Sequence, residues 1–261
     1  MSQVFIVSAS RTAVGSLGKS LKNISANNLG SCVISDVIKK TNLSPKEIDE
    51  VILGQVLSSA EGQNPARQAA IKSGIPIETP AYIVNQVCGS GIRSVASAFQ
   101  SIKAKDSKIV IAGGQENMSL APHAIHLRTG KKLGDADLID TMIKDGLWDA
   151  FNGYHMGVTA ENVAEKFQIT REEQDKFALR SQEKALEAQK QNKFKDEIIN
   201  FKIKSKKSEL DFNKDEHPRE GINLESLSRL KPVFKKDGTV TAGNASGIND
   251  GAAAVTLMSE E

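Results

Sequence analysis

The sequence predicts a layered α/β fold with a parallel sheet, into which a charged lobe is inserted. Short apolar runs alternate with segments of helical periodicity up to residue 118, and this alternation is typical of a parallel sheet covered by helices. Charge is unevenly spread, because residues 119–243 hold 22 Lys and Arg and 21 Asp and Glu, whereas the other 136 residues hold 23 charged residues in all. We therefore expect a core domain of residues 1–118 and 244–261 and an inserted loop domain of residues 119–243.

Each element of the core has its own local signal. Residues 26–40 place Leu29 and Val33 at helical spacing. Ser44 and Glu47 form a capping box with proline at the first helical position. The strands that we expect are at residues 4–7, 51–57, 81–85, 108–112 and 252–258, and the helices are at residues 26–40, 65–72 and 89–103.

The sequence predicts helices and loops for the inserted lobe. Thr170 and Glu173 form a second capping box, which opens a long helix with Phe177 and Ala185 along one face. Thr159 is a plausible N-cap for a shorter helix over residues 160–167. A short basic run, typical of a solvated strand or loop, consists of Lys202, Lys204, Lys206 and Lys207.

Composition argues against several classes of function. The 34 Lys and Arg against 32 Asp and Glu give a net charge of +2, whereas a protein that neutralises nucleic-acid phosphates usually has a clearer basic excess. There is no apolar run of about 18 residues, the length of a membrane span, and the N-terminus has no basic region of a secretory signal. Two cysteines cannot build a disulfide framework or a four-cysteine zinc site. We expect a cytoplasmic protein with free thiols and neither nucleic-acid nor membrane partners.

Cys88 is the residue most typical of chemistry, because it lies where a predicted strand ends and a helix begins. Helix N-termini present unpaired N–H groups and a partial positive charge, which favour a thiolate over a thiol. Gly89 and Gly91 leave space beside the sulfur for an electrophile. A small residue packed at a turn is the alternative, and the two glycines favour the nucleophile. Cys32 lies on the apolar face of a predicted helix without neighbouring glycines, and we expect it to fill the core.

Other motifs carry weaker signals. A dinucleotide-binding loop would need a third glycine where Ser94 stands, and no phosphate-binding P-loop occurs. His123 and His126 are three residues apart but lack acidic or cysteine partners, so we expect no metal site. Residues 239–252 form a run of small side chains, which either brings the backbone close to a ligand or makes a tight turn before the last strand.

Five motifs occur in a fixed order along the chain, at residues 8–12, 85–91, 113–119, 154–157 and 243–252. With these motifs the chain resembles the thiolase family, and in particular the acetyl-CoA acetyltransferases of the biosynthetic type. The resemblance implies a layered αβαβα fold of two similar halves, with a loop domain inserted in the first half. It places the family's acyl-accepting cysteine on Cys88. The pair His155 and Met156 points to the short-chain, acetoacetyl-CoA subtype.

The resemblance also implies a coenzyme A (CoA) site. Its residues are Leu147, His155 and Met156 beside the pantetheine arm, Arg219, Ser226 and Leu230 near the adenine, and Phe234, Ala242, Ser246 and Ile248 along the inner tunnel. No cofactor is implied, because CoA thioesters are the substrates. Family members form dimers or tetramers, so we expect a homo-oligomer.

The function implied by the resemblance is reversible transfer of an acetyl group from a Cys88 thioester to a second acetyl-CoA, which gives acetoacetyl-CoA and CoA. We also expect the chain to be truncated, since the family's second half, with its Gly-His-Pro, Asn-Glu-Ala-Phe and Cys-x-Gly segments, has no counterpart in residues 1–261. The alternative is a non-catalytic thiolase half that binds CoA weakly or assembles with a partner chain supplying the second half. A ketoacyl synthase is a third interpretation, and both the pair His155 and Met156 and residues 243–250 argue against it.

Overall fold

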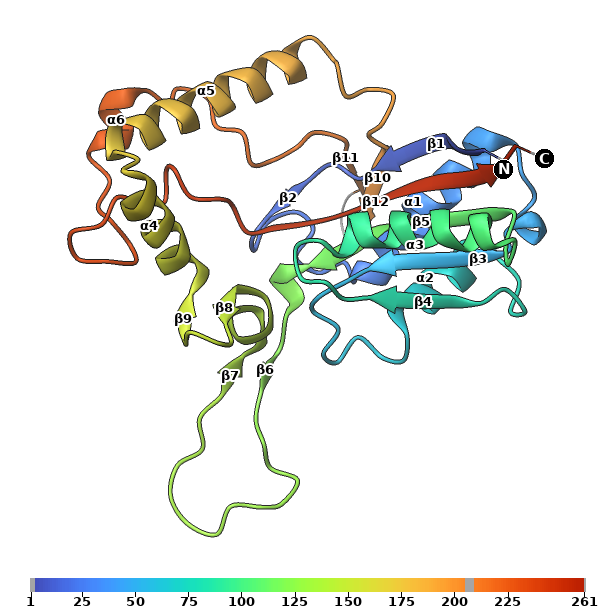
Figure 1. Cartoon of the computed structure of the whole chain (residues 1–261), viewed down its shortest axis with the longest axis horizontal. Coiled ribbons are helices and arrows are strands. Elements are labelled where there is room, and N and C mark those ends of the chain that lie inside the picture. Colours follow the sequence, from blue (N-terminus) through green and yellow to red (C-terminus); the bar gives the residue numbers. More distant parts are fainter. Residues whose placement is uncertain (1–2, 205–208, 261) are drawn as a thin grey trace.

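The computed structural model describes residues 3–204 and 209–260 and has a central sheet with helices on both faces (Figure 1). The strands of this sheet are β1 (Val4–Arg11), β2 (Gly15–Ser16), β3 (Glu50–Gly54), β4 (Ala81–Val84), β5 (Ile109–Asn117) and β12 (Asn249–Ser259). The helices around it are α1 (Ala26–Thr41), η1 (Pro45–Glu47), α2 (Pro65–Lys72) and α3 (Ser90–Ala104). The predicted layered α/β class is confirmed.

The sheet is mixed, with the strand order β1-β12-β5-β3-β4 and β2 paired to β12. The predicted parallel pairing is found between β3 and its neighbours β4 and β5. It is wrong for β12, which runs antiparallel to both β1 and β5. The chain leaves the sheet at Asn117 and returns opposite it at Asp250. A strand that returns at the same end can only run antiparallel.

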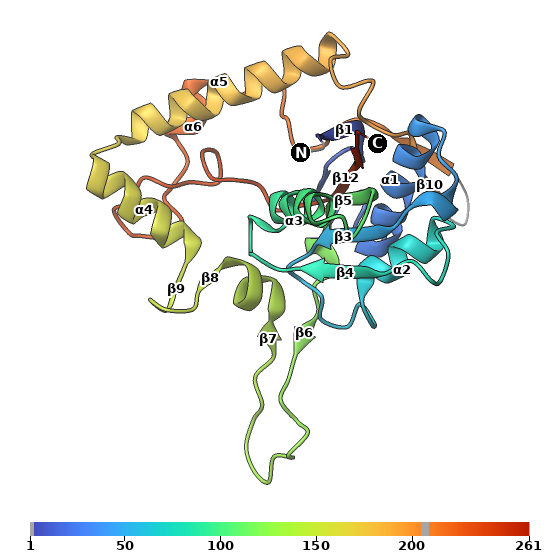
Figure 2. The ribbon, with the colours of Figure 1, turned by 45° about the vertical axis from the view of Figure 1, so that its right-hand side comes forward.

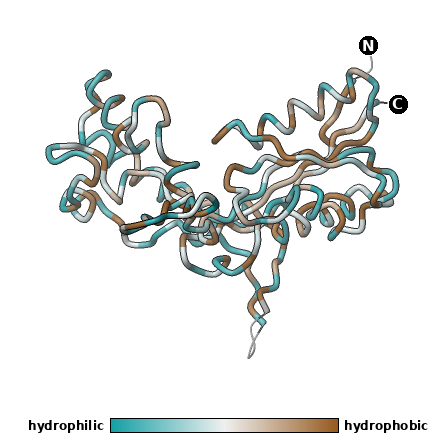
Figure 3. The backbone as a smooth tube through the Cα atoms, turned by 90° about the horizontal axis from the view of Figure 1, so that it is seen from below, coloured by the Kyte–Doolittle hydropathy of each residue, from teal (hydrophilic) through white to brown (hydrophobic). Residues whose placement is uncertain are grey.

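Alternating side chains divide the core between the two faces of the sheet. On β3, Val51 and Leu53 pack with α1 and α2, whereas Ile52 packs with Ala98 and Ile102 of α3. Figure 3 shows apolar segments along the strands of this lobe. The period of two follows from the pleat, and burial on both faces explains why the predicted strands are almost wholly apolar.

The local predictions hold for most of the core. The three predicted helices are confirmed as α1, α2 and α3, and α2 has the predicted bounds. Ser44 and Glu47 form the predicted capping box, although it opens only the short 3-10 helix η1. Strands β1 and β5 run well beyond their predicted ends at residues 7 and 112, because their continuations pair with β12.

The segment between β5 and β12 forms a second lobe beside the sheet (Figure 2). Its shorter elements are η2 (Met118–Leu120), β6 (His123–Ala124), β7 (Ile139–Asp140), η3 (Met142–Leu147), β8 (Trp148–Asp149), β9 (Tyr154–His155), β10 (Phe201–Lys204), β11 (Glu209–Phe212) and α6 (Leu224–Ser228). Its longer helices are α4 (Met156–Phe167) and α5 (Arg171–Lys190). Figure 1 shows the β6–β7 hairpin reaching away from both lobes.

Helix α4 begins earlier than the sequence predicted. Thr159 is not its N-cap; instead His155 occupies that position, and its Nδ1 accepts a hydrogen bond from the Gly157 backbone N–H at 2.9 Å. Imidazole is not among the side chains that usually cap helices. The sequence pattern therefore indicated as N-cap Thr159, which is the first threonine inside the helix.

Helix α5 begins at the predicted capping box of Thr170 and Glu173. The face of α5 that carries Phe177 is not the face that packs against the protein, since the Phe177 side chain is 77% exposed. The buried residue is Asp175, with 3% exposure. The helix thus turns a charged group inward, which only a partner inside the lobe can stabilise.

Part of the inserted lobe folds back onto the core through Arg11 at the end of β1. The Arg11 guanidinium donates two hydrogen bonds to the Asp215 carboxylate, at 2.8 and 3.1 Å, and one to Glu197 at 2.6 Å. Phe212 is buried in the same apolar cluster as α1. Residues 197–215 therefore pack with the sheet, and the boundaries proposed for the two domains stay a prediction.

The remaining surface features are simple. Lys202 and Lys204 of the basic run lie on β10, where Lys202 pairs with Glu209 at 2.7 Å, and Lys206 and Lys207 lie outside the described residues. No helix within residues 3–204 and 209–260 has the length and apolarity needed to cross a membrane.

Helix α3 lies unusually close to the end of β3. A Cβ atom on Gly54 would overlap the backbone of Ser90 and would lie 2.6 Å from the Gly91 nitrogen. By contrast, a Cβ on Gly91 would meet nothing within 4 Å outside its own chain neighbours and helix backbone. Glycine is thus required at residue 54 for the approach of α3, and not at residue 91.

We expect Gly54→Ala to destabilise the protein by about 1–3 kcal/mol, because a methyl group there must push two backbones apart. Gly91→Ala should be neutral or stabilising by ~0.5–1 kcal/mol, since it restricts the unfolded chain without a clash. Chemical denaturation of both variants measures the difference. Equal stability of the two variants would contradict the close packing.

Candidate active site

Cys88 lies in the short connection between β4 and α3, and its side chain is exposed. Gly89 is the N-cap of α3, with φ −83° and ψ −1°, and being glycine it offers no side-chain cap. The sulfur is therefore held next to the first turn of a helix of 15 residues. Cys32, in α1, is half-buried, and burial raises the pKa of its thiol. The two thiols thus differ in access, but the expectation that Cys32 fills the core is wrong, because it lies half-buried in α1 and outside the buried apolar clusters.

The residue before Cys88 has an unusual backbone. Val87 has φ +49°, in the left-handed region, and it is neither glycine nor asparagine. For a β-branched residue this is a true outlier, with a cost of about 1–3 kcal/mol. Such strain persists only where neighbouring groups hold it, and it often accompanies functional sites.

An open pocket of about 390 Å³ lies beside the sulfur. It is lined by the ends of β1, β3 and β5, the beginning of β12 and the start of α3, including Cys88, Gln55, Glu116, Asn249 and Asp250. Within the described part of the chain, no histidine lines this pocket. The C-terminal end of a parallel strand pair next to a helix N-terminus is the usual place for a ligand in such sheets.

Glu116 is the most perturbed carboxyl group of the pocket. Its pKa is raised to about 7, chiefly by burial, and the nearby carboxyls of Glu61 and Asp250 raise it further. Hydrogen bonds from the backbone N–H groups of Val56, at 2.8 Å, and Leu57 act in the opposite direction. The carboxyl group therefore anchors the turn after β3 and exchanges a proton near neutral pH.

A buried amide pair lies behind the same turn. The Gln115 Nε2 donates to Gln55 Oε1 at 2.8 Å, and Gln55 Nε2 donates to the Leu57 carbonyl at 3.0 Å. Among the described residues, the Gln115 Oε1 atom has no hydrogen-bond partner. It lies where a side chain on Gly30 would be. The turn over residues 55–57 is thus held from two sides, by Glu116 and by this pair.

His155 and Phe234 form the first cluster of residues that the resemblance assigned to CoA. Their rings stack with centroids 4.9 Å apart and planes 19° from parallel. Gly157 lies against the Phe234 ring, so a larger residue there would displace it. Met156 is 37% exposed next to this stack. The three predicted residues thus form one partly apolar surface.

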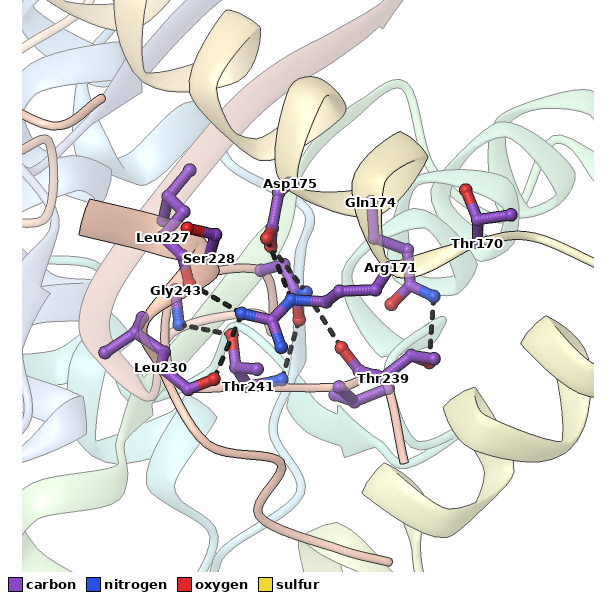
Figure 4. Close-up of polar contacts among 12 residues, drawn as sticks. Thr170, Arg171, Gln174, Asp175, Leu227, Ser228, Leu230, Thr239, Thr241 and Gly243 are labelled. Carbon is purple, nitrogen blue, oxygen red and sulfur yellow. Dashed lines mark hydrogen bonds and ion pairs between the residues drawn. The ribbon is translucent and has the colours of Figure 1, made fainter. Parts of the chain in front are cut away.

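A second cluster surrounds the turn over residues 239–244, shown in Figure 4. The Arg171 Nη2 donates to the carbonyls of Leu227 and Leu230, at 2.6 and 3.1 Å, and its Nε donates to Asp175 at 2.8 Å. Asp175 in turn accepts from Asn244 Nδ2 at 2.9 Å. This network pairs the buried Asp175 and joins α5, the end of α6 and the turn.

The run of small residues at 243–251 is used mainly for close packing. Gly243 makes room for Leu227 and Leu230, and Gly247 makes room for the His217 ring. Burial and the charges of Arg219 and Lys19 lower the pKa of His217. Two glycines of this run thus allow close packing within the lobe, and the approach of the backbone to a ligand stays a prediction.

The structure brings some predicted site residues together and leaves others apart. Leu230 lies at the Arg171 network, and Ala242 and Ser246 are exposed on the following loop. None of the ten residues assigned to CoA lines the described pocket of Cys88, although Ile248 directly precedes Asn249, which does. Leu147 lies at the end of η3, directly before Trp148, which pairs with His155. Ser226 lies in α6, and the backbone N–H of Arg219 donates to Gln182 at 2.9 Å.

The sequence did not predict a role in the site for Glu116, Val87 or the Arg171–Asp175 pair. Glu116 had a signal, since it is a charged residue at the end of an apolar strand. The positive φ of Val87 had none, because valine is among the residues least suited to it. Among the described residues there is no cluster of three or more His, Cys, Asp or Glu side chains that could hold a metal.

Comparison with known proteins fits this geometry. A family model described as "Thiolase, N-terminal domain" matches residues 4–261. The chain is 57% identical to "Acetyl-CoA acetyltransferase" of Paracoccus denitrificans, with 100% of this chain and 67% of that protein covered. It is 52% identical to "Probable acetyl-CoA acyltransferase" of Staphylococcus aureus (strain COL), with the same coverage. The crystal structure of the Bacillus anthracis acetyl-CoA acetyltransferase matches with a TM-score of 0.97 and 43% identity, covering 100% of this chain and 66% of that one.

The fold is therefore that of a thiolase-like α/β protein. The chain belongs to the thiolase family, and its residues 4–261 match the N-terminal domain. The resemblance inferred from the motifs is confirmed. The chain spans about two thirds of the length of the curated relatives that it matches.

We expect Glu116→Gln to stabilise the protein at about pH 8 and to have little effect at about pH 5. The raised pKa means that folding favours the protonated form. The stability contributed by this group is thus complete below its unfolded pKa and is lost as the pH rises through about 7. Thermal unfolding across this range measures the effect, with the exposed Glu78→Gln as control. A difference in Tm that is independent of pH would contradict it.

Proposed function

We propose that the chain carries the acyl-accepting part of an acetyl-CoA acetyltransferase, with Cys88 as the nucleophile. The observation that carries this proposal is the exposed Cys88 at the start of α3, opening into a pocket, in a chain 57% identical to a protein named acetyl-CoA acetyltransferase. By this proposal the protein acts in the cytoplasm, as a homo-oligomer, on acyl-CoA substrates and without a cofactor.

The first step is a transfer between two sulfurs. The Cys88 thiolate attacks the carbonyl carbon of acetyl-CoA, a new C–S bond forms, and the bond to the CoA sulfur breaks. CoA leaves as a thiolate and takes up the proton that Cys88 released. The positive end of the α3 dipole favours the attacking thiolate. The methyl carbon of a second acetyl-CoA would then lose a proton and attack the carbonyl carbon of the Cys88 thioester. A C–C bond forms and the bond to the Cys88 sulfur breaks, which gives acetoacetyl-CoA and a Cys88 thiolate that takes up the released proton.

The CoA arm would lie along the inserted lobe. The His155–Phe234 stack offers an apolar surface for pantetheine, with Leu147 and Met156 beside it. The loop with Ala242, Ser246 and Ile248 continues from there to Asn249 at the Cys88 pocket. Arg219, Ser226 and Leu230 would meet the nucleotide end, where the exposed guanidinium suits phosphate.

A second candidate function is a thiolase half that needs a partner chain or segment to work. The absence of histidine from the described lining of the Cys88 pocket favours it, since thiol activation usually needs a base. So does the exposure of apolar side chains on α3, with Ile92 at 74% and Phe99 at 44%. A covering surface would bury both side chains and bring a base to the sulfur.

We expect acetyl-CoA to acetylate Cys88 and not Cys32. Intact mass measurement followed by peptide mapping should find an acetyl group on the wild type and on Cys32→Ala, and none on Cys88→Ala. The half-buried position and raised pKa of the Cys32 thiol make it the slower of the two. Acetyl transfer that persists in Cys88→Ala would refute the assignment of the nucleophile. Acetylation without condensation would favour the second candidate function.

Ser246→Phe should weaken CoA binding by about tenfold or more, because a ring at this loop fills the path proposed for the pantetheine arm. Titration calorimetry with CoA measures the affinity. The exposed Ser35→Phe introduces the same ring on α1, which does not line the Cys88 pocket, and should bind CoA as the wild type does. Equal affinity of the Ser246 variant and the wild type would show that the arm lies elsewhere.

A further inference from the structure

We propose that Ser90 and Asn85 are positioning residues for Cys88, because together they hold Val87 in the strained conformation that presents the sulfur. The proposal deepens the function proposed for Cys88 and rests on it. Neither side chain is offered as a catalytic group, since each acts on the backbone of the connection and not on the substrate.

The two side chains form hydrogen bonds with the backbone N–H and carbonyl groups of Val87. The Val87 N–H donates to Asn85 Oδ1 at 3.0 Å, and the Val87 carbonyl accepts from Ser90 Oγ at 2.6 Å. The same Ser90 hydroxyl accepts from the Gln86 N–H at 2.9 Å. Both polar backbone groups of Val87 are thus satisfied by side chains in its left-handed conformation.

Ser90 is able to do this because it is itself immobilised. It is the first residue of α3 and is 4% exposed, and its backbone lies against Gly54 of β3. Its hydroxyl therefore has no freedom to turn to solvent. Asn85 is exposed, so its contribution is a local turn bond on the outer side of the connection.

Two backbone bonds run through the same connection and would survive the loss of the hydroxyl. Gly89 N–H donates to the Gln86 carbonyl at 3.0 Å, and Ser90 N–H donates to the Val87 carbonyl at 3.1 Å. They shape the turn, but they do not remove the penalty that a β-branched side chain has at positive φ. Without the hydroxyl, Val87 should relax and carry Cys88 away from the end of α3.

The substitution Val87→Gly should therefore remove the steric penalty at residue 87 directly. Glycine adopts positive φ without a steric penalty, so the two backbone bonds alone should keep the turn. Val87→Gly should therefore restore Cys88 in a protein that lacks the Ser90 hydroxyl. A merely structural loss of stability at α3 would not be repaired by adding a more flexible residue.

The test is the rate of Cys88 alkylation by iodoacetamide, followed by peptide mass mapping, with Cys32 in the same chain as internal reference. Ser90→Ala should slow alkylation of Cys88 about tenfold at neutral pH, because the sulfur loses its place at the helix N-terminus. The double variant Ser90→Ala with Val87→Gly should return to within about threefold of the wild type.

Ser94→Ala is the matched control on the same helix. The Ser94 hydroxyl is fully buried and bonds to Gly91 and Gly113, so its loss weakens the packing of α3 without touching the Val87 turn. We expect Cys88 to react in this variant as in the wild type. If Ser90→Ala does not fold, Asn85→Ala removes the other side-chain hydrogen bond to Val87 at an exposed position. This variant should also slow the alkylation of Cys88.

Wild-type reactivity of Cys88 in Ser90→Ala would overturn the proposal. So would a double variant as slow as Ser90→Ala, or equal slowing in Ser94→Ala. Because the probe is a small alkylating reagent, the result is independent of acetyl transfer. A protein that fails to acquire acetyl groups from acetyl-CoA, yet shows the loss and the rescue, would contradict the proposed function and leave the positioning role intact.

Discussion

The first turn of α3 lies directly against the end of β3, with only the hydrogens of Gly54 between the two backbones. This contact decides where the helix begins, and therefore where the chain must turn from β4 into α3. Within this connection Val87 has a positive φ, and Cys88 lines the pocket. Backbone packing thus places the connection, and the hydrogen bonds of Ser90 and Asn85 hold the conformation of Val87 within it.

Charged hydrogen bonds and ion pairs join the elements of the inserted lobe, whereas apolar contacts join those of the core. Arg11 joins the end of β1 to Asp215 and Glu197, and Arg171 joins α5 to α6 and the turn over residues 239–244. In each case a guanidinium satisfies several acceptors at once, a task for which its planar fork suits it better than lysine. The Arg11 contacts join the inserted lobe to the core, and the Arg171 contacts join elements within the lobe, so the placement of the lobe and its internal packing depend on them.

Local patterns predicted much of the fold, and pairing between distant segments explains what they missed. The apolar runs, the capping boxes and the glycines around Cys88 all report on neighbours within a few residues, and the elements that they indicated are present. The antiparallel course of β12 depends on where a segment of more than a hundred residues returns, which no local pattern encodes. The inward position of Asp175 and the raised pKa of Glu116 likewise depend on groups far away in the sequence, and the His155 ring that caps α4 stacks on the distant Phe234.

The place of β12 between β1 and β5 also bears on how the chain acquires its shape. Val4 pairs with Ser259 and Arg11 with Ala253, so the first strand made is joined to the last. Within the described chain β1 has no other strand partner, and β5 keeps one open edge until β12 arrives. Contacts of such sequence separation form slowly, and open strand edges invite association with other chains. Until β12 forms, a chain still being made therefore has β1 without a strand partner and β5 with one open edge, and both edges can associate with other chains.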